Sequence, residues 1–160
     1  MEEREAQAHD IVLQHAWWAG ALNLIPTPFI GTIANTAIHL KMLKSLSDHY
    51  GVEFTDELGK KLIASLIGGI VPSASAEAAR SLVRFIPVVG TVLGVVTLPV
   101  LSGATTYGIG EVFVQHFESG GTLLDFDPLG MKSYFAEKYE AGKTVMSSKR
   151  RRTRPAASTA

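Results

Sequence analysis

The segment Ile11–Leu40 reads IVLQHAWWAGALNLIPTPFIGTIANTAIHL and contains no Asp, Glu, Lys or Arg. A second uncharged segment extends from Phe85 to Gly110. A helix needs about 20 apolar residues to cross a bilayer, so both segments are long enough to meet a membrane. Proline and glycine interrupt both of them, at Pro26, Pro28, Gly31, Pro87 and Gly90. The two segments therefore predict either a membrane-associated protein or an apolar helical bundle core.

The composition lies between that of a globular domain and that of an integral membrane protein. Only 19% of the 160 residues are charged, against about 25% in ordinary globular chains, and the mean hydropathy is +0.18. The net charge is zero, which gives no overall attraction to nucleic acid. The acidic start Met1–Glu5 differs from a secretory signal and predicts a cytoplasm-facing location, at an inner or intracellular membrane.

The spacing of apolar residues predicts an all-α protein of helical hairpins that are broken at proline and glycine turns. The predicted helices cover residues 5–24, 28–50, 55–68, 73–84, 87–117 (with a kink at Pro99) and 129–140. Thr55 is a suitable N-cap, and Gly51 is a suitable residue to end the second helix. The last helix is amphipathic, and Asp127-Pro128 precedes it as a cap.

The chain divides by composition into three parts. Residues 1–118 form a helical membrane-associated domain, residues 119–141 a loop and the amphipathic helix, and residues 142–160 a disordered basic tail. Five basic residues gather in that tail: Lys149, Arg150, Arg151, Arg152 and Arg154. A solvated tail, contact with anionic lipid headgroups, and contact with nucleic acid are the three interpretations. We expect no nucleic-acid partner, because the folded part is not basic.

Proline in the middle of the first uncharged segment favours a hairpin over a straight span. Each half of this segment would measure about 20 Å as a helix, which is shorter than a hydrocarbon core of about 30 Å. Two hairpins would also leave all basic residues on one side of the membrane. The second segment contains a small-residue surface, with Gly90, Gly94, Gly103 and Gly108, that predicts close helix packing, either within a membrane or within a soluble core.

No catalytic or metal-binding pattern is present in the sequence. Cysteine is absent, and the five histidines lack metal-ligand spacing. The segment Glu140–Thr144 ends like a nucleotide-binding loop, but Glu137 stands where that motif needs glycine. We therefore expect a non-enzymatic protein without a cofactor.

Several short motifs resemble the YcjF-like family of unknown function, whose members are often fused to small GTPases or encoded beside them. The motifs are Leu24–Pro28, His39–Leu46, Tyr50–Val52, Phe85–Thr91 and Ala104–Gly110. The similarity covers roughly residues 16–117. It implies a helical, membrane-associated module that is in several members a GTPase partner. The fused members carry a GTPase domain and these 160 residues do not, so we expect any GTPase to act in trans.

The leading hypothesis is a scaffold or membrane-organising protein that contacts lipid and forms homo-oligomers. Two alternatives remain open. One is a soluble α-helical adaptor that binds a protein partner. The other is a small oligomeric pore or carrier, although polar residues for its lining are few: Asn23, Asn35, Thr105 and Thr106.

Overall fold

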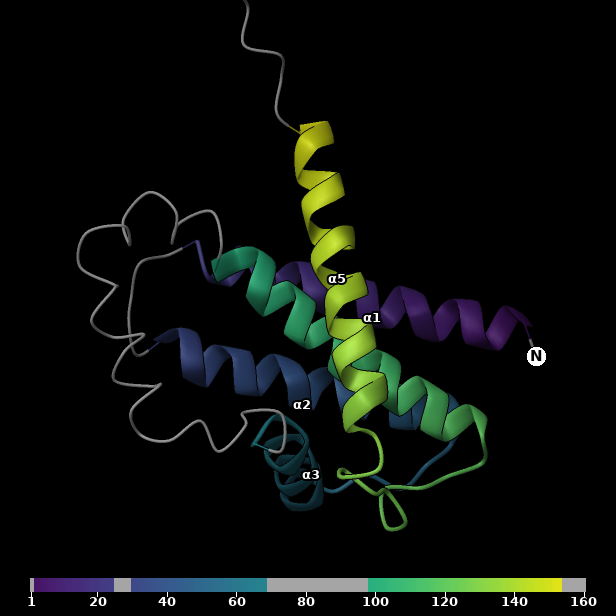
Figure 1. Ribbon diagram of the computed structural model, residues 1–160. Helices are drawn as coiled ribbons and strands as arrows, with labels where there is room; N and C mark the ends of the chain where they lie inside the picture. The colour runs from purple at the N-terminus through teal and green to yellow at the C-terminus, as the bar shows by residue number, and fades with distance from the viewer. Residues whose placement is uncertain (1, 25–29, 69–97, 154–160) are drawn as a thin grey trace, which may run out of the picture.

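The computed structural model describes residues 2–24, 30–68 and 98–153, and all regular secondary structure in these ranges is α-helical. Four helices carry labels in Figure 1: α1 (Glu2–Leu22), α2 (Ile30–Tyr50), α3 (Asp56–Gly68) and α5 (Lys132–Thr153). A further helix covers residues 98–118 and is named by these numbers below. The all-α prediction is confirmed for this part of the chain.

Two helices end with the same glycine motif. Gly51 follows α2 with φ +69°, and Gly120 follows helix 98–118 with φ +84°. After α2, the N–H of Val52 donates to the carbonyl of Ser47 at 2.8 Å. The N–H of Gly121 donates to the carbonyl of His116 at 3.0 Å in the same way. This pairing satisfies the last carbonyls of a helix and needs a left-handed residue, which glycine supplies.

The helix starts also follow from local sequence. Glu2, Glu3 and Glu5 lie in the first turn of α1, where negative charge suits the helix dipole. The N–H of Gly59 donates to the carbonyl of Thr55 at 3.0 Å, which makes Thr55 the cap of α3 as predicted. The N–H of Leu129 donates to the Asp127 carboxylate at 3.0 Å, but a turn over residues 128–131 delays α5 to Lys132.

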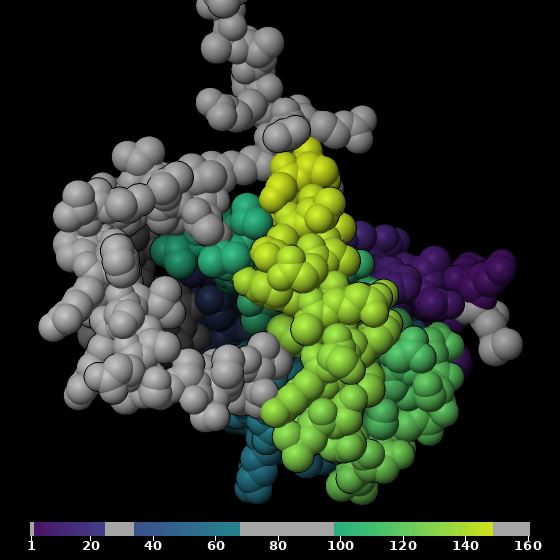
Figure 2. Space-filling model, viewed as in Figure 1, coloured from purple at the N-terminus to yellow at the C-terminus, as the bar shows by residue number. Residues whose placement is uncertain are grey.

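Helices α1, α2 and 98–118 pack lengthwise, and α5 crosses them steeply (Figure 1). Helix α1 is antiparallel to α2, because Asn23 contacts Asn35 near one end and His49 contacts Arg4 near the other. Helix 98–118 is also antiparallel to α1, since His9 contacts Glu111. Figure 2 shows α5 lying across the front of the molecule, over helix 98–118.

The hydrophobic core joins all five helices and the loop before α5. Phe113 is fully buried at its centre, stacked on Phe126 with ring centroids 4.5 Å apart. Leu46 from α2, Leu66 from α3 and Phe135 from α5 belong to the same cluster. The amphipathic face predicted for the last helix therefore packs on the domain.

The prediction of a disordered tail from residue 142 is wrong as far as Thr153, because α5 continues to that residue. Gly142, the first residue of the predicted tail, lies where α5 crosses helix 98–118. A Cβ atom at Gly142 would come within 3.0 Å of the Ala104 Cα. The glycine thus permits close approach of two helices, and tertiary contacts at Met146 hold the continuation. Residues 154–160 lie outside the described part of the chain.

Candidate membrane-facing surface

The lengthwise helices have two different ends. At the polar end lie the start of α1 and the last residues of α2 and helix 98–118. At the apolar end lie the end of α1, the first half of α2 and the first half of helix 98–118, which together line one open pocket of about 230 Å³. We use "apolar end" for residues 16–24, 30–38 and 98–106, and "polar end" for residues 2–9, 46–50 and 111–118.

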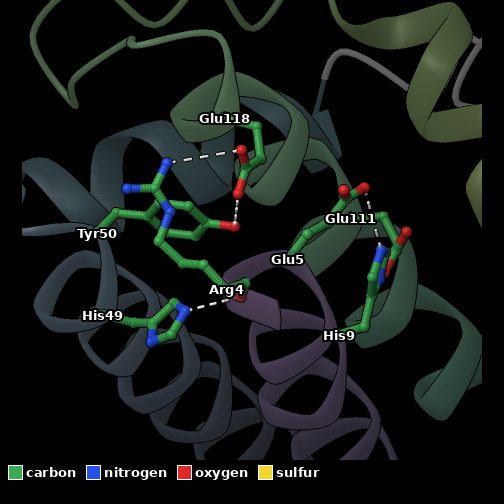
Figure 3. Close-up of polar contacts among 7 residues, drawn as sticks. All are labelled: Arg4, Glu5, His9, His49, Tyr50, Glu111 and Glu118. Carbon is green, nitrogen blue, oxygen red and sulfur yellow. Dashed lines mark hydrogen bonds and ion pairs between the residues drawn. The ribbon is translucent and has the colours of Figure 1, made fainter. Parts of the chain in front are cut away.

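A network of charged side chains closes the polar end (Figure 3). The Arg4 guanidinium lies 3.6 Å from the Glu118 carboxylate and 5.1 Å from the centre of the Tyr50 ring. The Tyr50 hydroxyl donates to Glu118 at 2.7 Å. Burial and this acidic neighbour raise the pKa of Tyr50, while the hydrogen bond from Tyr50 lowers the pKa of Glu118. The network fixes the start of α1 against two other helices.

A buried carboxylate lies beside this network. Glu111 of helix 98–118 is almost completely buried, and its carboxylate lies 2.6 Å from Nδ1 of His9 in α1. Burial raises the pKa of Glu111, and His9 opposes that shift. Glu5 lies 3.8 Å from the other ring nitrogen of His9 (Figure 3). This hydrogen-bonded pair links α1 to helix 98–118.

The apolar end is packed by small and polar residues. Its buried positions include Ala16, Ala19, Gly20, Gly103 and Ala104. A Cβ atom at Gly20 would come within 3.0 Å of the Pro99 carbonyl oxygen. Without large side chains between them, α1 and helix 98–118 approach closely, in the way typical of helices packed in membranes.

Hydrogen bonds between helices occupy the inside of the same end. The amide of Asn23 donates to Ser102 Oγ at 2.9 Å and to Asn35 Oδ1 at 3.1 Å. Ser102 Oγ donates to Asn35 Oδ1 at 3.1 Å. One turn further, His39 bonds the Thr106 hydroxyl at 3.0 Å, and burial lowers the pKa of His39 to about 4. These polar atoms thus bind one another across the three helices in a part-buried cluster.

The outside of the apolar end carries large apolar side chains. Trp18, Leu24 and Leu98 are 61%, 57% and 56% exposed. Leu24 also lines an open apolar groove of about 340 Å³, together with Trp17, Pro99 and Met146. No charged residue belongs to this end. A surface of this kind is costly in water and favourable in lipid.

Lysines stand at the inner limit of this uncharged surface. Lys41 of α2 lines a groove together with Trp18, and Lys143 of α5 follows Gly142, which contacts Ala104. Eleven residues separate Ile30 from Lys41, which corresponds to about 16 Å of helix. This length matches half of a hydrocarbon core of about 30 Å.

The structure describes only some of the residues predicted as site residues. Pro26, Pro28, Pro87, Gly90, Gly94 and Arg154 lie outside the described ranges. Gly31 is the second residue of α2, and residues 149–152 lie in the last turns of α5. Gly103 and Gly108 lie where α5 crosses helix 98–118, against Met146 and Phe135 respectively.

The cluster around Asn23 and the groove at Lys41 were not predicted as sites. Asn23 and Asn35 had been considered only as the lining of a pore, yet they bond each other and Ser102. Both asparagines are isolated polar residues in an uncharged segment and therefore need hydrogen-bond partners, which the sequence could have indicated. In the described ranges no group of His, Asp or Glu could hold a metal ion. No helix in these ranges is both long and apolar enough to span a bilayer.

Comparison with known proteins gives the family. Residues 1–133 match the domain of unknown function DUF697. This chain belongs to the DUF697 family. It is also 39% identical over 155 residues to magnetosome membrane protein 22 of Magnetospirillum gryphiswaldense, an alignment that covers 96% of this chain and 80% of the relative. No solved structure matches the chain. Membership of DUF697 is compatible with the resemblance to YcjF-like proteins.

Proposed function

We propose that this protein is a non-enzymatic membrane-associated module whose apolar end inserts into one leaflet. The observation that carries the proposal is the distribution of side chains at that end. Ala19 and Gly20 are buried and Asn23 is half-buried between the helices, while large apolar residues such as Leu24 and Leu98 are exposed. Helices in lipid are held together by close packing and polar contacts, because lipid supplies no hydrophobic drive between them.

The proposed depth follows from the helix lengths. With the apolar end in lipid, Trp18 and Lys41 would lie at the headgroup level, where tryptophan and lysine are commonly found. Helix α5 crosses the long helices near this level, and its basic residues 149–152 would lie close to the membrane surface. Insertion would thus be shallow, as in proteins that lie in the interface.

The relative's name, magnetosome membrane protein 22, supports association with a membrane. A scaffold or membrane-organising role, homo-oligomers and a GTPase partner in trans complete the proposal. These rest on the resemblance to YcjF-like proteins and on the sequence. The cytoplasm-facing orientation rests on the placement of the basic residues. The pore alternative receives no support from Asn23 and Asn35, because these residues bond each other.

A pair of matched double variants tests insertion. The first carries Leu24→Asp and Leu98→Asp in the apolar end. The second carries Leu124→Asp and Leu129→Asp, which replace leucines that are 85% and 68% exposed in the loop before α5. A charge at hydrocarbon depth costs about 2.5 kcal/mol or more, so the first pair should lower partition into phosphatidylcholine vesicles at least about 100-fold. The second pair should leave it nearly unchanged.

Both variants change exposed side chains, and circular dichroism in detergent verifies that they fold. Equal partition of the wild type and the first variant would contradict insertion through the apolar end. A wild-type chain that stays in solution without vesicles or detergent would favour the soluble adaptor. Resistance of the wild type to alkaline carbonate extraction would add support for insertion.

A further inference from the structure

A groove of about 440 Å³ lies on the surface between α1 and α2. Its residues change character along the helices. Leu22 and Ile38 line the part nearest the apolar end. Trp18 and Lys41 follow about one turn further on. Beyond them the groove is lined by Ser45 of α2 and Gln14 of α1. The groove is therefore apolar, then cationic, then polar and uncharged.

Lys41 is the charged group of this groove. Its side chain is exposed and makes no ion pair with any residue in the described ranges. The other lysine on the same stretch of α2, Lys44, bonds Asp48 at 2.9 Å. Lys61 on α3 bonds Glu57 at 3.0 Å. The ammonium group beside the groove is thus available to an external anion, whereas Lys44 and Lys61 are each paired within their own helix.

We propose that this groove binds one anionic phospholipid. Its phosphate would lie against Lys41, and one acyl chain would follow Leu22 and Ile38 toward the apolar end. The order of apolar and cationic residues in the groove is the order of acyl chain and phosphate in a lipid. The distance of about 16 Å from Ile30 to Lys41 also places the ammonium at phosphate depth in a leaflet. The inference rests on the proposed insertion and names the lipid class that it selects.

Ser45 and His15 support the headgroup part of the assignment. The hydroxyl of Ser45 is a donor for a glycerol or phosphate oxygen at the polar side of the groove. Nδ1–H of His15 donates to the Ile11 carbonyl at 2.8 Å, which holds the ring at the wall of the groove. The exposed indole of Trp18 covers the boundary between the two parts, as tryptophan does in membrane interfaces.

The test compares Lys41→Gln with Lys60→Gln in the full-length chain. Lys60 is an exposed lysine on α3 outside the groove, so both variants lose the same charge. Partition is measured into vesicles of phosphatidylcholine alone and of phosphatidylcholine with phosphatidylglycerol. The basic residues of α5 are unchanged in both variants. A basic group near a charged membrane contributes about 1 kcal/mol, so Lys41→Gln should lower the preference for anionic vesicles about fivefold. Lys60→Gln should not.

Native mass spectrometry from detergent supplies the second measurement. The wild type and Lys60→Gln should each retain one phosphatidylglycerol per chain, and Lys41→Gln should lose it. Equal preference of wild type and Lys41→Gln for anionic vesicles would overturn the groove assignment and leave insertion intact. A lipid-free dimer in place of the adduct would also overturn it and assign the groove to a second copy. Absence of binding to both vesicle types would overturn insertion itself.

Discussion

The two halves of helix 98–118 are packed in opposite ways. Near the polar end, Ile109, Phe113 and Phe117 are buried against other large apolar side chains, while Gln115 faces water. Near the apolar end, Gly103 and Ala104 are buried and Leu98 is exposed. The first half follows the rule for proteins in water, where burial of apolar area drives folding. The second half follows the rule for helices in lipid.

Under the proposed insertion, one helix would be adapted to two solvents along its length. A mean hydropathy of +0.18 averages over both halves and conceals the difference. The polar half provides a folded body with its own core, which anchors α1, α2 and α5. The apolar half presents a preformed surface, so the proposed lipid contact would require little ordering of these helices.

The first prediction tests where folding energy is concentrated. Phe113→Ala removes a fully buried ring that stacks on Phe126, and we expect a loss of about 3–5 kcal/mol in the free energy of unfolding. Leu98→Ala truncates an exposed side chain and should change that free energy by less than about 0.5 kcal/mol. Urea unfolding in mild detergent, followed by circular dichroism, gives both values. Similar losses at the two positions would break the distinction between the halves.

The second prediction concerns His39 of α2, which lies between the apolar end and the polar end. Its pKa is lowered from 6.5 to about 4 by burial. Between about pH 6.5 and pH 4, the unfolded chain therefore carries a proton on His39 that the folded protein does not carry. Stability should fall through this window as the pH decreases, by about 3 kcal/mol in total.

His39→Gln is the variant for this measurement, because a glutamine amide can still bond Thr106. Acidification from pH 6.5 to 4 should lower the unfolding free energy of the wild type more than that of the variant. The wild-type value minus the variant value should therefore decrease steadily across this window. The raised pKa of Glu111 gives an opposite slope in both proteins, and it cancels in the difference. A pH-independent difference would contradict burial of a neutral His39.

Local sequence was sufficient to predict most of the helices. Thr55 as a cap, Gly51 as a terminator and the apolar spacing of α3 gave boundaries within a few residues. The predicted start of α1 at residue 5 was three residues late, because the acidic first turn begins at Glu2. These features depend on neighbours a few residues away, which is why a single sequence reveals them.

Features that depend on distant residues could not be predicted. The last helix was predicted to end at residue 140, and the position of Gly142 against Ala104 helps to explain why α5 continues to Thr153. The inward direction of Asn23 depends on Ser102, which is 79 positions away in the sequence. The hairpin residues Pro26 and Pro87 lie outside the described ranges, so their predicted role stays a prediction.

The smallest predicted effect concerns the polar contacts inside the apolar end. Asn23→Leu removes the donor to Ser102 and Asn35, but Ser102 still donates to Asn35. Because no acceptor is fully orphaned, we expect a loss of about 1 kcal/mol in unfolding free energy in detergent, the usual value for bonds between helices in lipid. Gln7→Leu, an exposed change of the same kind near the start of α1, should have no measurable effect.

The direction of the Asn23 effect distinguishes two explanations of the inward polar residues. If these bonds hold α1, α2 and helix 98–118 together, the leucine variant is less stable and its vesicle binding is retained, since the outer surface is unchanged. If Asn23 instead lines a path for solute, leucine would stabilise the bundle by replacing a poorly satisfied amide with an apolar side chain. If the variant is more stable, the contacts of Asn23 do not support lipid-type packing. The close approach of helices at Gly20 and Gly103 would then be the remaining support.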